Sequence, residues 1–221
     1  MQIGAVFDCD GTLVDSVDGW RSVEREFARM CGQELTPEDT EQLCTFTIDE
    51  TGVFYYTKFG LGKSPQHVVD MIHDILEDYY TNVVELRPGV GEFLEGMAQA
   101  GVPMTVASSS PQRFLQPGLK RTGIFDYFSL VLSTDDVNAP KREPKIYLAA
   151  AEHMGTPVAS TWGFEDSIYA VRTLVNAGFK CAGCYDRDDS ATMEQLRDES
   201  HFLIESFDMV TAVQFLAQAR V

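Results

Sequence analysis

The chain has 221 residues, 44% of them hydrophobic, and its 34 acidic and 17 basic residues give a net charge of −17. A chain of this size forms one domain with a modest insertion, or two small domains. The negative charge and the lack of a basic tract argue against a nucleic-acid partner, because phosphate backbones bind basic surfaces. No apolar stretch has the length of a membrane span, so we expect no membrane partner either.

The cysteines and the amino terminus bear on the compartment. Five scattered cysteines fit a reducing compartment better than a disulfide framework. Cys181 and Cys184 form a single C-x-x-C pair within a predicted strand, which favours a structural role over zinc or redox chemistry. The first apolar run begins at Ile3 and leaves no room for a targeting segment, so we expect a cytoplasmic protein.

A short apolar run at residues 3–7 predicts a buried strand near the amino terminus. The run ends at two carboxylates, Asp8 and Asp10, which are followed by Gly11. Because neighbouring like charges resist ionising, this pair indicates a bound metal, an acid/base pair, or both. The alternative is that the two aspartates only shape a turn, since Asp-Gly is a common turn pair.

Helical periodicity replaces this pattern between residues 17 and 84. The first predicted helix has an apolar face with spacings of three and four, made of Trp20, Val23, Phe27 and Met30. Thr36 and Ser64, each followed by proline, are start signals for two further helices. We therefore predict a helical domain at residues 17–84, inserted into a second domain formed by residues 1–16 and 85–221.

Strands and helices alternate through the rest of the chain. Short apolar runs predict strands at residues 102–107, 130–132, 161–164, 180–185 and 202–204. Helical spacing predicts helices at residues 91–100, 111–122, 144–154, 168–177 and 191–198, and a final helix that begins at Phe207. This alternation predicts an α/β fold with a parallel sheet that helices cover on both faces.

Polar side chains follow several of the predicted strands. They are Asp8, Asp10, Ser108, Glu165 and Asp166, and Lys141 precedes the helix at residue 144. Since the carboxyl ends of parallel strands lie at one edge of a sheet, we expect these side chains to converge there. Together they supply a nucleophilic carboxylate, a second carboxyl group for proton transfer, a hydroxyl group, a lysine, and acids for a hard cation such as Mg²⁺.

The same residues form four motifs that span nearly the whole chain. They are Asp8-Cys9-Asp10-Gly11-Thr12, Val106-Ala107-Ser108, Lys141 followed by Pro144, and Gly163-Phe164-Glu165-Asp166-Ser167. In these motifs the chain resembles the haloacid dehalogenase-like superfamily, in the branch whose helical cap follows the first strand. The resemblance implies a Rossmann-like, doubly wound parallel sheet with an inserted α-helical cap. It also implies a hydrolase that removes phosphate from a small phosphorylated metabolite.

The resemblance assigns catalytic roles to these residues. It makes Asp8 the nucleophile that forms an aspartyl-phosphate. Asp10 protonates the leaving oxygen and then deprotonates the attacking water. Ser108 binds the phosphoryl group, and Ser109 is a second candidate for substrate binding. Capping of the following helix is the alternative role for Ser109 and for Ser110.

The resemblance also assigns a metal site. Mg²⁺ is expected on the side chains of Asp8 and Asp166 and on the backbone carbonyl of Asp10, with Glu165 close by or acting through water. Lys141 is expected to offset the developing charge and to contact the substrate phosphate. The helical insertion is expected to act as a lid that excludes water.

The chain departs from the family pattern in two places. The lysine motif usually reads Lys-Pro-x-Pro-Asp, whereas here it reads Lys141-Arg142-Glu143-Pro144-Lys145, which changes the loop that carries the lysine. Trp20 stands where sequences similar to beta-phosphoglucomutase carry a histidine, and their basic cap motif is missing. The second departure favours a phosphatase over a mutase. The alternatives are a sugar-phosphate mutase, a catalytically silent binding protein and a dehalogenase. The sequence leaves the oligomeric state open and is compatible with a monomer.

Overall fold

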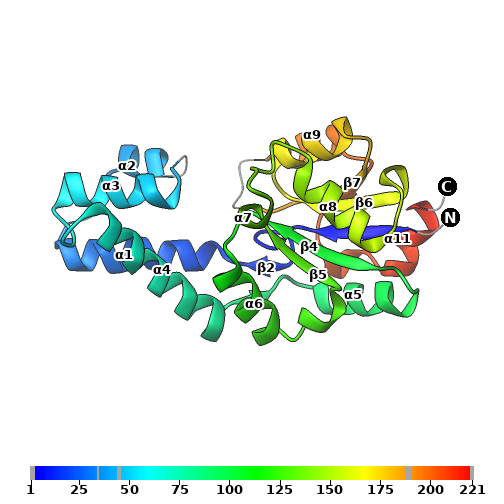
Figure 1. Ribbon diagram of the computed structural model, residues 1–221, viewed down its shortest axis with the longest axis horizontal. Helices are drawn as coiled ribbons and strands as arrows, with labels where there is room; N and C mark the ends of the chain where they lie inside the picture. Colours follow the sequence, from blue (N-terminus) through cyan, green and yellow to red (C-terminus); the bar gives the residue numbers. More distant parts are fainter. Residues whose placement is uncertain (1–2, 34, 44–45, 188–190, 220–221) are drawn as a thin grey trace. The chain divides into compact units, whose positions relative to one another are not determined.

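The structure, a computed structural model, describes residues 3–33, 35–43, 46–187 and 191–219. The chain divides into two compact units (Figure 1). The first, here named the α/β unit, consists of Met1–Ser16 and Val84–Val221, and the second, the helical unit, consists of Val17–Val83. None of the helices in the described part of the chain is long and apolar enough to cross a membrane.

The described residues of the α/β unit form a six-stranded sheet at its centre. Its strands are β1 (Gly4–Phe7), β4 (Met104–Ser108), β5 (Leu130–Ser133), β6 (Thr161–Glu165), β7 (Lys180–Cys184) and β8 (Phe202–Ile204). They lie in the order β5-β4-β1-β6-β7-β8, and each neighbouring pair is parallel. The predicted α/β fold with a parallel sheet is confirmed. The first strand of the chain lies inside this sheet, between β4 and β6.

Helices follow the strands in the α/β unit. They are α5 (Val90–Gln99), α6 (Gln112–Arg121), α7 (Thr134–Val137), α8 (Lys145–Met154), α9 (Ile168–Asn176), α10 (Met193–Glu199) and α11 (Ala212–Ala219). The sequence does not predict the four-residue helix α7. The prediction that the last helix begins at Phe207 is wrong, because Phe207–Met209 form only a 3₁₀ turn. The hydroxyl of Thr211 accepts the N–H of Gln214 at 3.2 Å, and this cap begins α11 at Ala212.

The side chains of β1 alternate between two cores, one on each face of the sheet. Val6 belongs to a buried cluster with residues of α8, α9 and α10. Phe7 points the other way and stacks on Phe164, with 4.2 Å between the ring centroids. Phe93 of α5 and Phe215 of α11 each lie within 6 Å of Phe164 on that face. Figure 1 shows helices on both sides of the sheet. Burial on both faces explains why β1 reads as a continuous apolar run.

Two short strands pair where the chain leaves and re-enters the α/β unit. These are β2 (Val14–Asp15) and β3 (Glu85–Leu86), and they run antiparallel. Val14 pairs with Leu86, and Asp15 pairs with Glu85. The sequence does not predict this ladder, because a strand of two residues shows no alternation.

In the described residues, the helical unit contains α1 (Val17–Cys31), α2 (Pro37–Leu43), α3 (Ile48–Phe59) and α4 (Pro65–Asn82). The hydroxyl of Thr36 accepts the N–H of Asp39 at 3.2 Å, and that of Ser64 accepts the N–H of His67 at 3.1 Å. Both start signals therefore act as N-caps, which satisfy backbone donors that the first helical turn leaves unpaired.

The predicted apolar face of α1 is correct for only two of its four residues. Val23 and Phe27 are buried, but Trp20 is 39% exposed and Met30 is 47% exposed. The buried stripe runs instead through Gly19, where a β-carbon would lie 2.7 Å from the ring of a tyrosine in α4. Because glycine has no side chain, α1 and α4 approach closely at this point. Hydrophobic spacing carries no signal for such a contact.

Candidate active site

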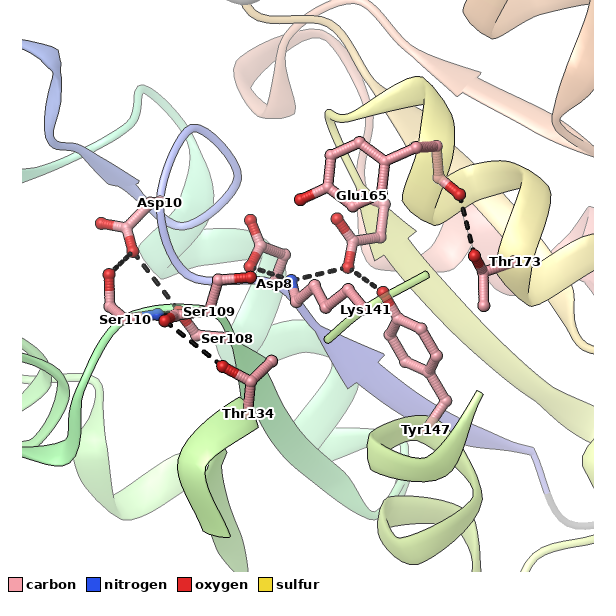
Figure 2. A network of polar contacts seen from close by, with 11 residues as sticks. Asp8, Asp10, Ser108, Ser109, Ser110, Thr134, Lys141, Tyr147, Glu165 and Thr173 are labelled. Carbon is pink, nitrogen blue, oxygen red and sulfur yellow. Dashed lines mark hydrogen bonds and ion pairs between the residues drawn. The ribbon is translucent and has the colours of Figure 1, made fainter. Parts of the chain in front are cut away.

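The carboxyl edge of the sheet gathers side chains from distant parts of the chain (Figure 2). Asp8 directly follows β1, Ser108 ends β4, and Glu165 ends β6 with Asp166 directly after it. Because β4, β1 and β6 are adjacent parallel strands, their ends lie side by side. Lys141 reaches the same edge from the connection between α7 and α8.

Lys141 points into the protein, and only 3% of its side chain is exposed. Its Nζ donates to Oδ1 of Asp8 and to Oε1 of Glu165, the latter at 2.8 Å. Both acids are buried as well. A buried ammonium group between two buried carboxylates compensates charges that would otherwise be costly to remove from water. The altered lysine motif therefore leaves the lysine facing the site.

Tyr147, the third residue of α8, adds a second donor to this group. Its buried hydroxyl donates to Oε1 of Glu165 at 2.7 Å, the same oxygen that accepts from Lys141 (Figure 2). Two donors on one oxygen hold the carboxylate of Glu165 in a fixed orientation. The sequence gives no signal for this role, because Tyr147 lies on the buried apolar side of α8.

Burial sets the charge states at this edge. It raises the pKa of Asp8, an effect that Lys141 opposes and that Glu165 and Asp10 reinforce. Burial alone would lower the pKa of Lys141, but the ion pairs with Asp8 and Glu165 outweigh it and hold that pKa above its ordinary value. Burial also raises the pKa of the Cys9 thiol, so this cysteine stays protonated and is no nucleophile.

Asp10 lies beside the serines at the end of β4. Its Oδ2 accepts from Oγ of Ser110 at 2.7 Å and from Oγ of Ser108 at 3.4 Å (Figure 2). The backbone N–H of Ser110 donates in turn to Oγ of Ser108 at 2.9 Å. The alternative in which Ser109 or Ser110 caps the following helix is wrong, because the N-cap residue of α6 is Pro111. Ser109 is exposed, and its carbonyl accepts from Oγ1 of Thr134 at 3.5 Å.

A group of acids at this edge has the chemistry of a metal site. One oxygen from each of Asp8, Glu165 and Asp166 lies within 4.8 Å of the others, and all three side chains are buried. Gly11 makes room for the carboxylate of Asp166, because a β-carbon there would lie 2.0 Å from Oδ2 of that residue. A ligand set made only of oxygens fits a hard divalent cation. Among the described residues this group does not include the carboxylate of Asp10, whose expected ligand is its backbone carbonyl.

Comparison with known proteins identifies the family. The model of the family described as haloacid dehalogenase-like hydrolase matches residues 5–184. The chain belongs to this family. The matched residues contain all four motifs, so the predicted family and the predicted enzyme class are confirmed.

Relatives of this haloacid dehalogenase-like hydrolase include named phosphatases. Phosphorylated carbohydrates phosphatase of Thermotoga maritima is 26% identical over 176 residues, which cover 79% of this chain and 81% of that protein. Phosphoglycolate phosphatase of Escherichia coli is 28% identical over an alignment of 204 residues, which covers 82% of this chain and 78% of that protein. The structure of beta-phosphoglucomutase from Clostridium difficile shares the fold with a TM-score of 0.73 and 18% identity, covering 100% of this chain and 98% of that one.

Proposed function

We propose that this haloacid dehalogenase-like hydrolase is a Mg²⁺-dependent phosphatase of small phosphate monoesters. The observation that carries the proposal is the buried contact between Asp8 and Lys141, which lies beside the carboxylate of Asp166. The names of the relatives, which specify phosphoglycolate and phosphorylated carbohydrates, support a small phosphorylated metabolite as the substrate. The free cysteines among the described residues support a cytoplasmic location.

In the proposed reaction, a carboxylate oxygen of Asp8 attacks phosphorus, and the bond from phosphorus to the leaving oxygen breaks. Asp10 gives its proton to the leaving oxygen, so the alcohol departs and an aspartyl-phosphate forms on Asp8. Asp10 then takes a proton from the water that attacks this phosphorus, which releases inorganic phosphate and restores Asp8. The hydroxyls of Ser108 and Ser110 orient the carboxyl group of Asp10 for both proton transfers.

The remaining site residues manage charge. Lys141 keeps a positive charge beside the nucleophile and offsets the charge that develops on the phosphoryl group. Asp8, Asp166 and the backbone carbonyl of Asp10 would hold Mg²⁺, with Glu165 beside it. When bound, this ion supplies the positive charge that lets an anionic nucleophile approach an anionic phosphate. We also propose that the helical unit serves as a cap that excludes water during the reaction.

Hydrolysis of an aryl phosphate tests the proposal. We expect turnover with Mg²⁺, loss of turnover in EDTA, and loss of turnover in Asp8→Asn, which keeps the shape of the side chain but removes the nucleophile. Asp126→Asn is the matched control, because Asp126 is exposed at the start of a 3₁₀ turn away from the sheet edge. Activity that survives Asp8→Asn, or that EDTA leaves unchanged, contradicts the proposal.

Product analysis separates the phosphatase from a sugar-phosphate mutase. The enzyme is given a hexose phosphate with and without a sugar bisphosphate as activator. A phosphatase releases inorganic phosphate in both cases, whereas a mutase converts the sugar phosphate to its isomer and depends on the activator. A panel of sugar, glycolate and nucleotide phosphates then identifies the substrate class by kcat/KM.

A further inference from the structure

Arg87, the residue directly after β3, contacts two loops that are far apart in sequence. Its Nη1 donates to the carbonyl oxygen of Gly11, in the turn after β1. Its Nη2 donates to the carbonyl oxygen of Tyr185 at 2.7 Å, in the loop after β7. Nη1 also forms an ion pair with Oδ2 of Asp186 at 2.7 Å, and this pair is largely buried, with 18% and 10% of the two side chains exposed.

The order of the strands relates the contacts of Arg87 to Asp166. β6 lies between β1 and β7 in the sheet, and β6 is the strand that Asp166 follows. Arg87 therefore fastens the loop on one side of Asp166 to the loop on the other side. At the β-carbon position that Gly11 lacks, Oδ2 of Asp166 would be 2.0 Å away and Oδ2 of Asp186 3.1 Å away. The backbone of Gly11 thus limits where both carboxylates can lie.

We propose that Arg87 is a positioning residue for the candidate metal site. It holds the turn after β1 at a fixed spacing from the loop after β7, and it neutralises Asp186 beside Asp166. The carboxylate of Asp166 is thereby kept in place for Mg²⁺ without Arg87 touching the ion. This inference rests on the proposed function in one respect, the assignment of Asp166 as a metal ligand.

Arginine is suited to this position and lysine is not. The guanidinium group presents several N–H donors in a rigid plane, so it serves two carbonyls and a carboxylate at once. Lysine would keep the positive charge but would place a single nitrogen among three separated acceptors. Groups that orient a metal ligand from outside the coordination shell change metal affinity about 10-fold to 100-fold when they are replaced.

Direct binding of Mg²⁺, measured by calorimetry on the whole protein without substrate, tests the inference. We expect the Kd for Mg²⁺ to rise about 10-fold in Arg87→Lys and about 100-fold in Arg87→Met. Arg172→Met is the matched control, because it removes an exposed arginine that makes two hydrogen bonds with Glu199 away from these loops. The control is expected to bind Mg²⁺ with the wild-type Kd.

The charge of Asp186 provides a second test. In Arg87→Met, this carboxylate loses the cation beside it and repels Asp166 from a position suited to Mg²⁺. We therefore expect the double variant Arg87→Met/Asp186→Asn to bind Mg²⁺ more tightly than Arg87→Met alone. The wild type, the two single variants and the double variant form a double-mutant cycle. If the losses of Mg²⁺ affinity in the two single variants simply add in the double variant, the charge part of the inference is contradicted.

Stability measurements separate positioning from general support of the fold. Urea unfolding in EDTA gives the free energy of unfolding of each variant without the metal. If Arg87→Lys is less stable but binds Mg²⁺ with the wild-type Kd, the inference is overturned. If Arg87→Met does not fold, the Kd of Arg87→Lys alone decides between the two outcomes. A wild-type protein that binds Mg²⁺ but hydrolyses no phosphate ester refutes the proposed function, while the binding comparison still tests Arg87.

Discussion

Asp8 and Lys141 form a buried ion pair although 133 residues separate them along the chain. Lys141 also pairs with Glu165, so one ammonium group serves two carboxylates inside the protein. Neither contact involves the helical unit. Both contacts therefore lie within the α/β unit.

Lys141→Met removes the cation that two buried carboxylates share. Removing one partner from a buried ion pair costs about 3–5 kcal/mol, so we expect a loss of this order in the free energy of unfolding. The measurement is urea unfolding at pH 8 in EDTA. Lys145→Met is the matched control, because Lys145 is 59% exposed and lies 3.7 Å from an exposed glutamate. A control that loses as much stability as Lys141→Met would refute the argument.

Tyr147→Phe removes only the hydroxyl that donates to Oε1 of Glu165. A hydrogen bond to a charged group contributes about 1.5–3 kcal/mol, and we expect a loss of stability in that range. We also expect kcat to fall about tenfold, because Glu165 is then held by one donor fewer. Tyr56→Phe removes an exposed hydroxyl in the helical unit and is expected to change neither quantity. Wild-type stability in Tyr147→Phe would show that the contact is unimportant.

Ser110→Ala deletes the 2.7 Å hydrogen bond to Asp10 and leaves the longer one from Ser108. Since Asp10 is proposed to move protons and not to bind substrate, we expect kcat to fall about tenfold with little change in KM. Ser110→Thr keeps a hydroxyl at this position and is expected to restore most of the activity. Steady-state kinetics with an aryl phosphate provide the measurement, and a change confined to KM is the contrary result.

Gly11→Ala and Gly123→Ala separate backbone strain from a clash. Both glycines have nearly the same left-handed backbone, with φ of +77° and +76°. A β-carbon at Gly123 meets nothing within 4 Å, whereas one at Gly11 would lie 2.0 Å from Asp166. We expect Gly123→Ala to lose only the strain, about 1–2 kcal/mol. Gly11→Ala should lose more stability, measured by urea unfolding, and should also lose Mg²⁺ binding, measured by calorimetry. Equal losses of stability in the two variants would exclude the clash.

His201 predicts a pH dependence of stability. Its Nδ1 accepts the backbone N–H of Cys181 at 3.2 Å, and burial, aided by Lys180, lowers its pKa. The unfolded chain therefore binds this proton more readily. The contribution to stability is complete above the unfolded pKa of about 6.5 and is lost as the pH falls through the lower folded pKa.

His201→Asn replaces this acceptor with one that does not titrate. We expect the wild type to lose more stability than the variant between pH 7.5 and pH 5, as measured by urea unfolding at several pH values. Parallel stability curves for the two proteins would show that His201 makes no such contribution.

Periodicity and turn signals are sufficient to predict the sheet and most helices of the described residues. The run before Asp8 is confirmed as a strand, because a strand buried on both faces is continuously apolar. The strand at Phe202–Ile204 is confirmed as well, at the edge of the sheet. The pair β2 and β3 is not predictable, because two residues carry no period. Spacing places Trp20 on a buried face, since it identifies a stripe of residues but does not show which helix will meet it.

The sequence predicts only part of the candidate site. The ends of parallel strands meet at one edge, and this predicts that Asp8, Asp10, Ser108, Glu165 and Asp166 converge. Lys141 precedes a helix and enters the prediction through the loop that carries it and the family motif. Arg87 and Tyr147 are not predictable for a physical reason, because their contacts are with partners that the sequence does not identify. Arg87 reaches Gly11 and Tyr185 across 76 and 98 residues, and no local pattern encodes such a contact.

The ladder of β2 and β3 has a consequence for the architecture of the whole chain. Asp15 and Glu85 are paired neighbours, so the chain leaves the α/β unit and re-enters it at adjacent positions. A short turn would be enough to join these two positions. Insertions of very different length can thus be accommodated at this point, during evolution or by protein engineers, without separating β2 from β3.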